Sequence, residues 1–143
     1  WRGEKTAFEN NIKNVRFLRT KVDFIEKLFN QNEVSEIWLT FSDPQPKKPR
    51  KRLTSPLFID RYRSILKKGG TIHLKTDSDL LYEYTIEQIE ENNYTIIQNI
   101  NHIYKDFSNL NDELKNTLNI KTFYEIKWLK MNKKIKYLSF NID

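Results

Sequence analysis

The run from Ile37 to Phe41 limits the fold of this chain more than any other segment. Its residues are apolar or β-branched and carry no charge, which is the pattern of a strand buried on both faces of a parallel sheet. Asp43 and Pro44 then end the strand in a loop, because proline removes a backbone donor and disfavours helical geometry in the preceding residue. Ligands bind at the carboxyl ends of strands in open α/β sheets, so Asp43 is a candidate for contact with a substrate.

A cluster of cations follows directly in segment 47–52. It consists of Lys47, Lys48, Arg50, Lys51 and Arg52. The formal net charge is +6, so these cations supply +5 of it and the remainder of the chain +1. Charge concentrated in one loop is typical of a docking site for a polyanion, and phosphate contacts position nucleic acid without reading its sequence. A solvated loop without a ligand is the alternative interpretation.

Helix and strand patterns alternate along the chain. The predicted helices are 4–13, 22–29, 55–68, 79–92 and 122–131, and the predicted strands are 15–19, 37–41, 71–76, 94–100 and 135–142. Ser55-Pro56 begins one helix and Gly69-Gly70 ends it, while 105–121 forms a polar, mobile excursion. The alternation predicts one doubly wound α/β domain over 1–143 with a mostly parallel sheet.

The predicted helices carry apolar stripes, which indicate the faces they bury. These stripes are Ala7, Phe8 and Ile12; Phe58, Tyr62, Ile65 and Leu66; and Leu80, Tyr84, Ile86 and Ile89. His73 lies inside a predicted strand, which favours a packed core residue over a ligand.

A second carboxylate, Asp77, follows the predicted strand 71–76. It is expected at the same edge of the sheet as Asp43, although a cap of the following helix is an equally good interpretation. The segment Thr122-Phe123-Tyr124-Glu125 has the pattern of a capping box, in which the threonine hydroxyl and the glutamate carboxylate each satisfy a backbone donor.

Composition excludes several classes of protein. The 143 residues, of which 38% are hydrophobic, suffice for one ordinary core. The absence of cysteine excludes disulfides and zinc-thiolate sites, and we expect no bound metal. No run approaches the ~18 apolar residues of a membrane helix, and the start does not resemble a signal peptide, so a cytoplasmic protein is expected. Because the chain opens on Trp1 without a methionine, we also expect a fragment.

Three segments together resemble the bacterial tRNA (guanine-N7)-methyltransferase family, whose members use S-adenosylmethionine. They are FSDPQPKKPRKRLTSPLF from Phe41, LKKGGTIHLKTD at 66–77 and TFYE at 122–125, and the match covers most of 14–142. The chain departs from the family at Gln45, where members usually have Trp, and its basic segment is shorter. Lys21 stands where members usually have an acidic residue near the adenine.

The resemblance implies a class I methyltransferase fold whose first two strands lie upstream of Trp1. Those strands would bring a glycine-rich turn and an acidic strand end to the cofactor, whereas the glycines of this chain are Gly3, Gly69 and Gly70. By resemblance, Asp43 is the catalytic acid and also contacts S-adenosylmethionine. The residues implied to contact substrate are Lys47, Asp77, Thr122, Phe123, Tyr124 and Glu125, and those expected at RNA phosphates are Lys48, Arg50, Lys51 and Arg52.

The function predicted from this combination is methyl transfer from S-adenosylmethionine to guanine N7 in tRNA, with this chain carrying the tRNA side of the site. Guanine N7 already holds a lone pair, so the carboxylate of Asp43 would align the base rather than deprotonate it. One rival hypothesis is a basic RNA-binding remnant without catalysis. A weaker one is a methyltransferase that acts on something other than nucleic acid, which the clustered cations disfavour.

Overall fold

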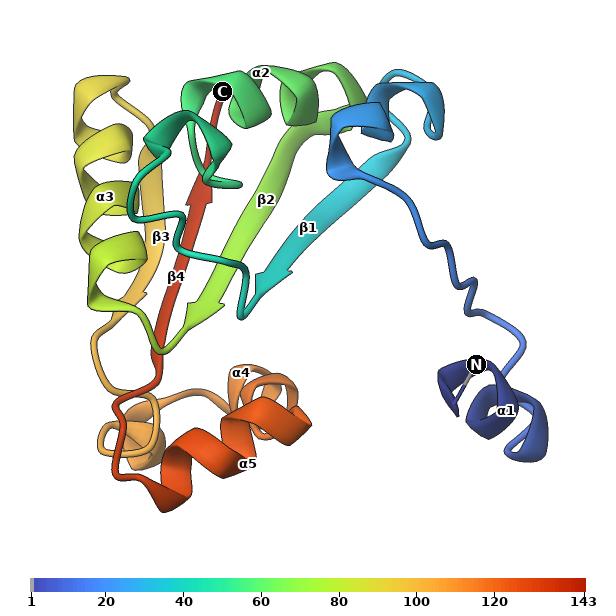
Figure 1. Ribbon diagram of the computed structural model, residues 1–143, viewed down its shortest axis with the longest axis vertical. Helices are drawn as coiled ribbons and strands as arrows, with labels where there is room; N and C mark the ends of the chain where they lie inside the picture. The colour runs from blue at the N-terminus through green and yellow to red at the C-terminus, as the bar shows by residue number, and fades with distance from the viewer. Residues whose placement is uncertain (1) are drawn as a thin grey trace.

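The computed structural model describes residues 2–143, and four of its strands form one mixed sheet (Figure 1). In the order β1-β2-β4-β3, the strands are β1 (Val34–Thr40), β2 (Leu66–Thr76), β4 (Lys136–Asn141) and β3 (Thr95–Ile100). β1 and β2 run parallel, whereas β4 is antiparallel to both of its neighbours. The α/β class is confirmed, but the prediction of a mostly parallel sheet was wrong within residues 2–143.

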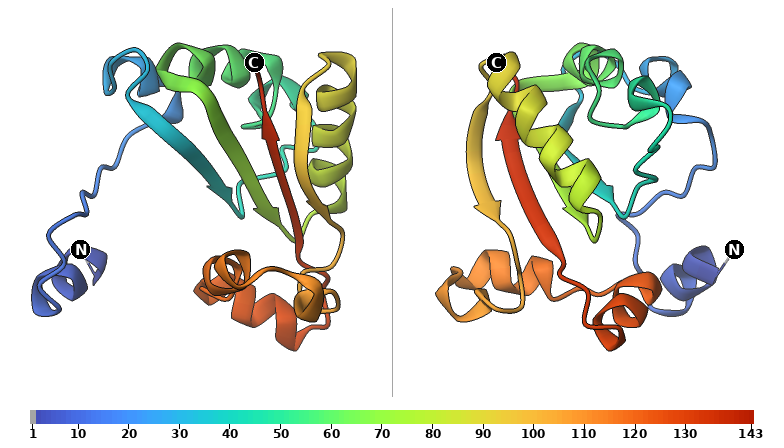
Figure 2. Two further views of the ribbon diagram at one scale, coloured as in Figure 1. Left: turned by 180° about the vertical axis from the view of Figure 1, so that it is seen from behind. Right: turned by 60° about the vertical axis from the view of Figure 1, so that its left-hand side comes forward.

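Two helices, α2 (Pro56–Ile65) and α3 (Asp79–Glu91), cover one face of the sheet (Figure 2). The predicted stripe of α2 is confirmed, because Phe58, Tyr62, Ile65 and Leu66 are all buried. For α3 the prediction was partly wrong, since Leu80 is 42% exposed while Leu81 and Tyr82 are buried. The sheet side chains of this core are Leu39, Ile72, Leu74, Leu138 and Phe140.

Three short elements lie at the end of the sheet where β1 and β2 terminate (Figure 1): η3 (Phe107–Asn109), α4 (Asp112–Leu118) and α5 (Phe123–Lys130). They pack over a second apolar cluster that includes Ile103, Leu118, Ile135 and Tyr137. The segment predicted as a polar excursion therefore contains helices, and its mobility stays a prediction. The helix predicted at 122–131 is confirmed.

The N-terminal part differs most from expectation. Helix α1 (Arg2–Glu9) lies apart from the sheet in both figures, and of its predicted apolar face Ala7 is buried whereas Phe8 is 88% exposed. Residues 15–19 were predicted as a strand, which was wrong, because they pair with no strand of the described chain. The 3-10 helix η1 (Val22–Lys27) contacts α2 through Arg61, whose Nη1 lies 3.1 Å from Asp23 Oδ1.

The glycine pair has a different role from the predicted helix end. Helix α2 stops at Ile65 and β2 begins at once, so Gly69 and Gly70 lie within the strand. Val34 pairs with Leu66 but Glu36 pairs with Thr71, which places residues 67–70 in a bulge. Gly69 has a φ of 74°, and a Cβ on Gly70 would lie 2.8 Å from the carbonyl oxygen of Lys67. Both positions therefore require glycine.

β1 lies at an edge of the described sheet. Leu39 is its one buried residue and Trp38 is half-buried, so the prediction of burial on both faces was wrong for residues 2–143. Its second edge has no neighbouring strand in the part of the chain that the structure describes. That two further strands precede Trp1 stays a prediction. In residues 2–143 no helix combines the length and apolar character needed to span a membrane.

Candidate active site

The ends of β1 and β2 bring Asp43 and Asp77 to one cavity. The strands run in parallel register, with Thr40 paired to Lys75, so the loops that follow them emerge side by side. The cavity has a volume of about 310 Å³, and its lining residues are Phe41, Ser42, Asp43, Pro44, Asp77, Ser78, Tyr124 and Trp128. The expectation that two strands deliver carboxylates to the same edge is confirmed.

The backbone around Asp43 is held in an unusual conformation. Phe41 and Gln45 have φ angles of 51° and 45°, in the left-handed region that residues with a side chain rarely adopt. The amide of Phe41 donates to the carbonyl of Lys75 at 2.8 Å, and the amide of Gln45 donates to Asp43 Oδ1 at 2.9 Å. Asp43 thus closes its own turn, and its exposed carboxylate has further acceptor positions for a ligand. Strain of this kind accumulates at binding sites.

Asp77 does not cap the helix that follows it. Ser78 does so, because its hydroxyl oxygen accepts a hydrogen bond from the amide of Leu81 at 3.2 Å. Asp77 Oδ2 instead pairs with Lys133 Nζ at 3.0 Å, and the same ammonium lies 3.9 Å above the centre of the Trp128 ring. The helix-cap interpretation of Asp77 was therefore wrong, and its carboxylate pairs with Lys133 beside the cavity.

The basic loop divides into exposed cations and one buried cation. Lys47, Lys48, Arg50 and Lys51 are exposed, with 49–51 forming the short helix η2 (Pro49–Lys51). Arg52 is 5% exposed, donates from Nε to the carbonyl of Pro44 at 2.9 Å and lies 4.3 Å above the ring of Tyr84. The described environment of Arg52 does not fit its predicted phosphate contact, because the guanidinium is used inside the protein to hold the loop.

The segment Thr122 to Glu125 forms the predicted capping box. Thr122 Oγ1 accepts from the amide of Glu125 at 3.1 Å, and Glu125 Oε2 accepts from the amide of Thr122 at 3.3 Å. Glu125 is fully buried and its Oε1 lies 2.8 Å from Lys75 Nζ, so in this conformation its carboxylate is not available to a substrate. Phe123 and Tyr124 are exposed, and Tyr124 is the member of this segment that lines the cavity.

Three residues near the cavity were not predicted from the sequence. Trp128 lies four residues after Tyr124 on the same side of a helix, a spacing that could have indicated it. Lys75 is a cation among the buried residues 72–76 at the end of β2, which signals a buried partner. Lys133 lies in a turn, where no pattern distinguishes it from other exposed lysines.

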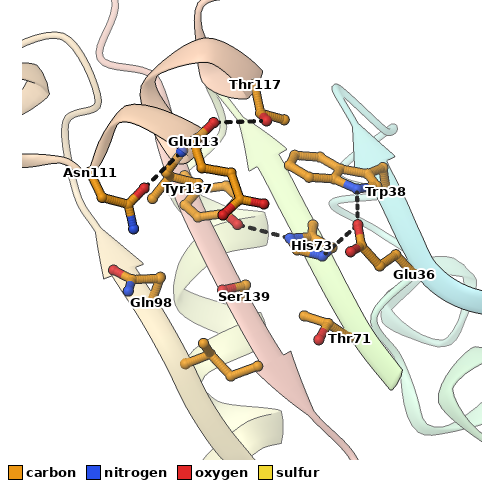
Figure 3. A pocket seen from close by; sticks show the side chains of 12 residues that line it. Glu36, Trp38, Thr71, His73, Gln98, Asn111, Glu113, Thr117, Tyr137 and Ser139 are labelled. Carbon is orange, nitrogen blue, oxygen red and sulfur yellow. Dashed lines mark hydrogen bonds and ion pairs between the residues drawn. The ribbon is translucent and has the colours of Figure 1, made fainter. Parts of the chain in front are cut away.

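A second cavity, of about 300 Å³, lies over the other face of the sheet (Figure 3). None of its lining residues belongs to the predicted site. His73 forms a hydrogen bond with the Tyr137 hydroxyl at 2.8 Å and stacks on Trp38, with ring centroids 4.1 Å apart. The prediction that His73 is a packed residue is confirmed, and burial lowers the pKa of its imidazole.

No group of three or more His, Asp or Glu side chains within residues 2–143 is arranged to hold a metal ion. The side chains around the candidate site are carboxylates and aromatic rings, with a neighbouring cation, Lys133.

Comparison with known proteins identifies the family. A family model described as "Putative methyltransferase" matches residues 3–138. The chain belongs to this family. It is 47% identical over 142 residues to a tRNA (guanine-N(7)-)-methyltransferase of Bacteroides thetaiotaomicron, covering 99% of this chain and 54% of the relative. It is 42% identical over 144 residues to the protein of the same name from Christiangramia forsetii, covering 99% of this chain and 62% of the relative.

These relatives confirm the resemblance that the three sequence segments indicated. The match to the Bacteroides fragilis protein is similar, at 47% identity over 140 residues, 98% of this chain and 54% of the relative. The chain therefore spans about half the length of the Bacteroides relatives.

Proposed function

We propose that this chain carries the tRNA and guanine side of a site that transfers a methyl group from S-adenosylmethionine to guanine N7. The observation that carries the proposal is the convergence of Asp43, Asp77 and two aromatic side chains on one cavity, next to a loop with four exposed cations. The names of the relatives support the choice of tRNA and guanine over other substrates.

The cavity offers the complement of a guanine edge. The base presents N–H donors on its Watson–Crick edge and acceptors at N7 and O6, so carboxylates on one side of it would pair with the donors and leave N7 open. Asp43 and Asp77 supply such acceptors, while Tyr124 and Trp128 supply the aromatic surface that an unstacked base requires. In this arrangement the protein aligns N7, whose lone pair needs no general base, and alignment is its contribution to the rate.

The exposed cations Lys47, Lys48, Arg50 and Lys51 would bind RNA phosphates beside this cavity. They directly follow the turn that holds Asp43, and Arg52 fixes that turn through the carbonyl of Pro44. A phosphate contact made here therefore sets the position of the nucleotide relative to Asp43. Lys47, nearest to Asp43 in the chain, is the cation we assign to the target nucleotide.

S-adenosylmethionine would supply the methyl group, and residues 2–143 would provide only part of its binding site. Asp43 is the residue we assign to both cofactor and base, whereas Lys21 stands where an adenine contact is expected and offers no acceptor. The remaining contacts would come from two further strands added at the unpaired edge of β1.

Methylation by the Asp43→Asn variant tests the proposal in the active enzyme, which we take to be this chain joined to the N-terminal segment of its relatives. The variant keeps the shape of the side chain but loses its charge, so the single-turnover rate should fall about ten- to a thousandfold while tRNA affinity changes little. Asp60→Asn, an exposed aspartate on α2, is the matched control and should retain the wild-type rate.

Two results would contradict the proposal. A wild-type enzyme that binds tRNA but does not methylate guanine N7 would favour the RNA-binding remnant. An Asp43→Asn variant with the wild-type rate would leave Asp43 as a turn residue only.

A further inference from the structure

Lys75 is a buried cation that has no assigned role in the proposed reaction. It lies on β2, two residues before Asp77, and its side chain is almost fully buried. Its Nζ lies 2.8 Å from Glu125 Oε1 and donates hydrogen bonds to the carbonyls of Leu118 at 2.8 Å and Ile120 at 3.3 Å. The three donors of the ammonium thus have three acceptors, all outside the strand that carries it.

Both carboxylate oxygens of Glu125 also have hydrogen-bond partners. Its Oε1 also accepts a hydrogen bond from the Tyr104 hydroxyl at 2.6 Å, and its Oε2 closes the capping box with the amide of Thr122. Burial lowers the pKa of Lys75, and the carboxylate of Glu125 opposes that shift. A buried pair of this kind contributes little net stability, because desolvation offsets the attraction, but it permits only a narrow range of geometries.

The pair joins the two halves of the candidate site. Asp43 and Asp77 are delivered by the strands, whereas Tyr124 and Trp128 are delivered by α5. Lys75 connects them, because it lies on β2 and holds both the loop before α5 and the third residue of that helix. Apolar packing of Leu118 and Leu129 also holds α4 and α5 at this end of the sheet, but such contacts tolerate sliding better than directed hydrogen bonds do.

We propose that Lys75 is a positioning residue for methyl transfer: through Glu125 it fixes Tyr124 and Trp128 against Asp43 and Asp77 and does not touch the substrate itself. This inference rests on the proposed function. It gives Glu125, the buried member of the TFYE segment, an indirect role in place of the direct contact predicted for it.

The double variant Lys75→Met/Glu125→Met separates positioning from stability in the active enzyme. Two apolar side chains of similar length remove both charges together, so no buried charge is left unpaired and the variant should still fold. Its thermal midpoint should fall, because the Leu118 and Ile120 carbonyls, the Tyr104 hydroxyl and the Thr122 amide lose their partners. The helix that carries Tyr124 and Trp128 would lose its hydrogen-bonded attachment to β2. A displacement of the two rings by about 1 Å is expected to lower kcat about ten- to a hundredfold. The Kd for tRNA should change less than about twofold, because the basic loop is intact.

Two further variants serve as controls. Tyr104→Phe removes one hydrogen bond from the same carboxylate and leaves Lys75 in place, so kcat should stay within about threefold of the wild type. Lys75→Arg retains a positive charge opposite Glu125, but its longer, planar side chain holds the carboxylate at a different position. This variant should fold and have a lower kcat than the wild type. Lys75→Arg therefore decides the question if the double variant does not fold.

The outcomes distinguish this inference from the function on which it rests. A wild type that leaves guanine N7 unmethylated would refute the function. If the wild type is active and the folded double variant has an unchanged kcat, the positioning role alone is refuted. If the double variant does not fold, an unchanged kcat in folded Lys75→Arg refutes the positioning role instead. A fall in kcat accompanied by a similar fold-loss of tRNA affinity and a large drop in the thermal midpoint would also refute the positioning role, since that combination indicates general unfolding.

Discussion

Lys133 and Asp77 form an ion pair across the wall of the candidate site, with 3.0 Å between Nζ and Oδ2. Their side chains are 42% and 20% exposed, so water screens the attraction and the pair contributes about 0 to 1 kcal/mol to stability. The same ammonium lies over the ring of Trp128. The pair therefore orients a carboxylate and an aromatic ring relative to each other and does little to hold the fold.

Replacing Lys133 with Gln should accordingly change the free energy of unfolding by less than about 1 kcal/mol. Urea denaturation of the variant and of Lys130→Gln, an exposed lysine in the last turn of α5, provides the comparison. A loss above about 2 kcal/mol for Lys133→Gln alone would show that the pair attaches the helical end to the sheet.

Replacing Lys48, Arg50 and Lys51 with Gln should weaken tRNA binding and flatten its dependence on salt. Each lost phosphate contact removes about 0.7 to 0.9 from the slope of log K against log salt concentration, so the triple variant should lose about 2 to 3. A filter-binding titration measures both quantities. The control replaces Lys67, Lys68 and Lys105, which are exposed and lie outside the basic loop, with Gln.

For Arg52, in the same loop, we expect an effect on stability and not on the salt dependence of tRNA binding. Arg52→Ala should lower the free energy of unfolding by about 1 to 3 kcal/mol, because it removes a charged hydrogen bond to Pro44 and the contact with Tyr84. The salt slope should stay unchanged in the folded protein. A salt slope reduced as much by Arg52→Ala as by one of the exposed cations would restore the phosphate role predicted from the sequence.

The elements with local signals were predicted well from the sequence. The capping box at Thr122, the proline start of α2 and the end of a strand shortly before Asp43 each depend on a few neighbouring residues. The first two are found where expected, and β1 ends at Thr40, one residue before the predicted end. The meeting of Asp43 and Asp77 could also be predicted, since parallel strands end at a common edge.

The errors concern features that depend on distant partners. The alternation of residues 15–19 suits a strand, but a strand also requires a neighbouring edge, which the sequence of the segment does not reveal. The direction of β4 depends on the helical segment before it. Glu125 was assigned to substrate by the family resemblance and Arg52 to phosphate as a member of the basic segment. Neither assignment could take account of the partners inside the protein, which are Lys75 for Glu125, and Pro44 and Tyr84 for Arg52.

His73 should make folding stability sensitive to mild acid. Burial lowers its pKa below 6.5 in the folded protein, although the nearby carboxylate of Glu36 partly opposes the shift. Below pH 6.5 the unfolded chain therefore binds a proton that the folded chain resists, so the contribution of His73 is complete above pH 6.5 and decreases as the pH falls toward the folded pKa.

Urea denaturation between pH 7.5 and 5.5 measures this effect. His73→Gln should remove most of the decrease, whereas His102→Gln, which changes the other histidine, should retain it. An equal slope in the wild type and in His73→Gln would show that another group causes the pH dependence.

The 143-residue chain alone should bind tRNA without methylating it. Its proposed RNA contacts lie in the loop after β1, within the described fold. S-adenosylmethionine would meet one assigned side chain, Asp43, and the edge of β1 that has no neighbouring strand among residues 2–143. A small polar ligand needs several placed partners in a largely enclosed site, so cofactor affinity should be lost. Calorimetry should detect no S-adenosylmethionine binding and a labelled-methyl assay no turnover, while a gel at low salt shows a tRNA complex. Cofactor binding by this chain would instead mean that residues 2–36 complete the pocket.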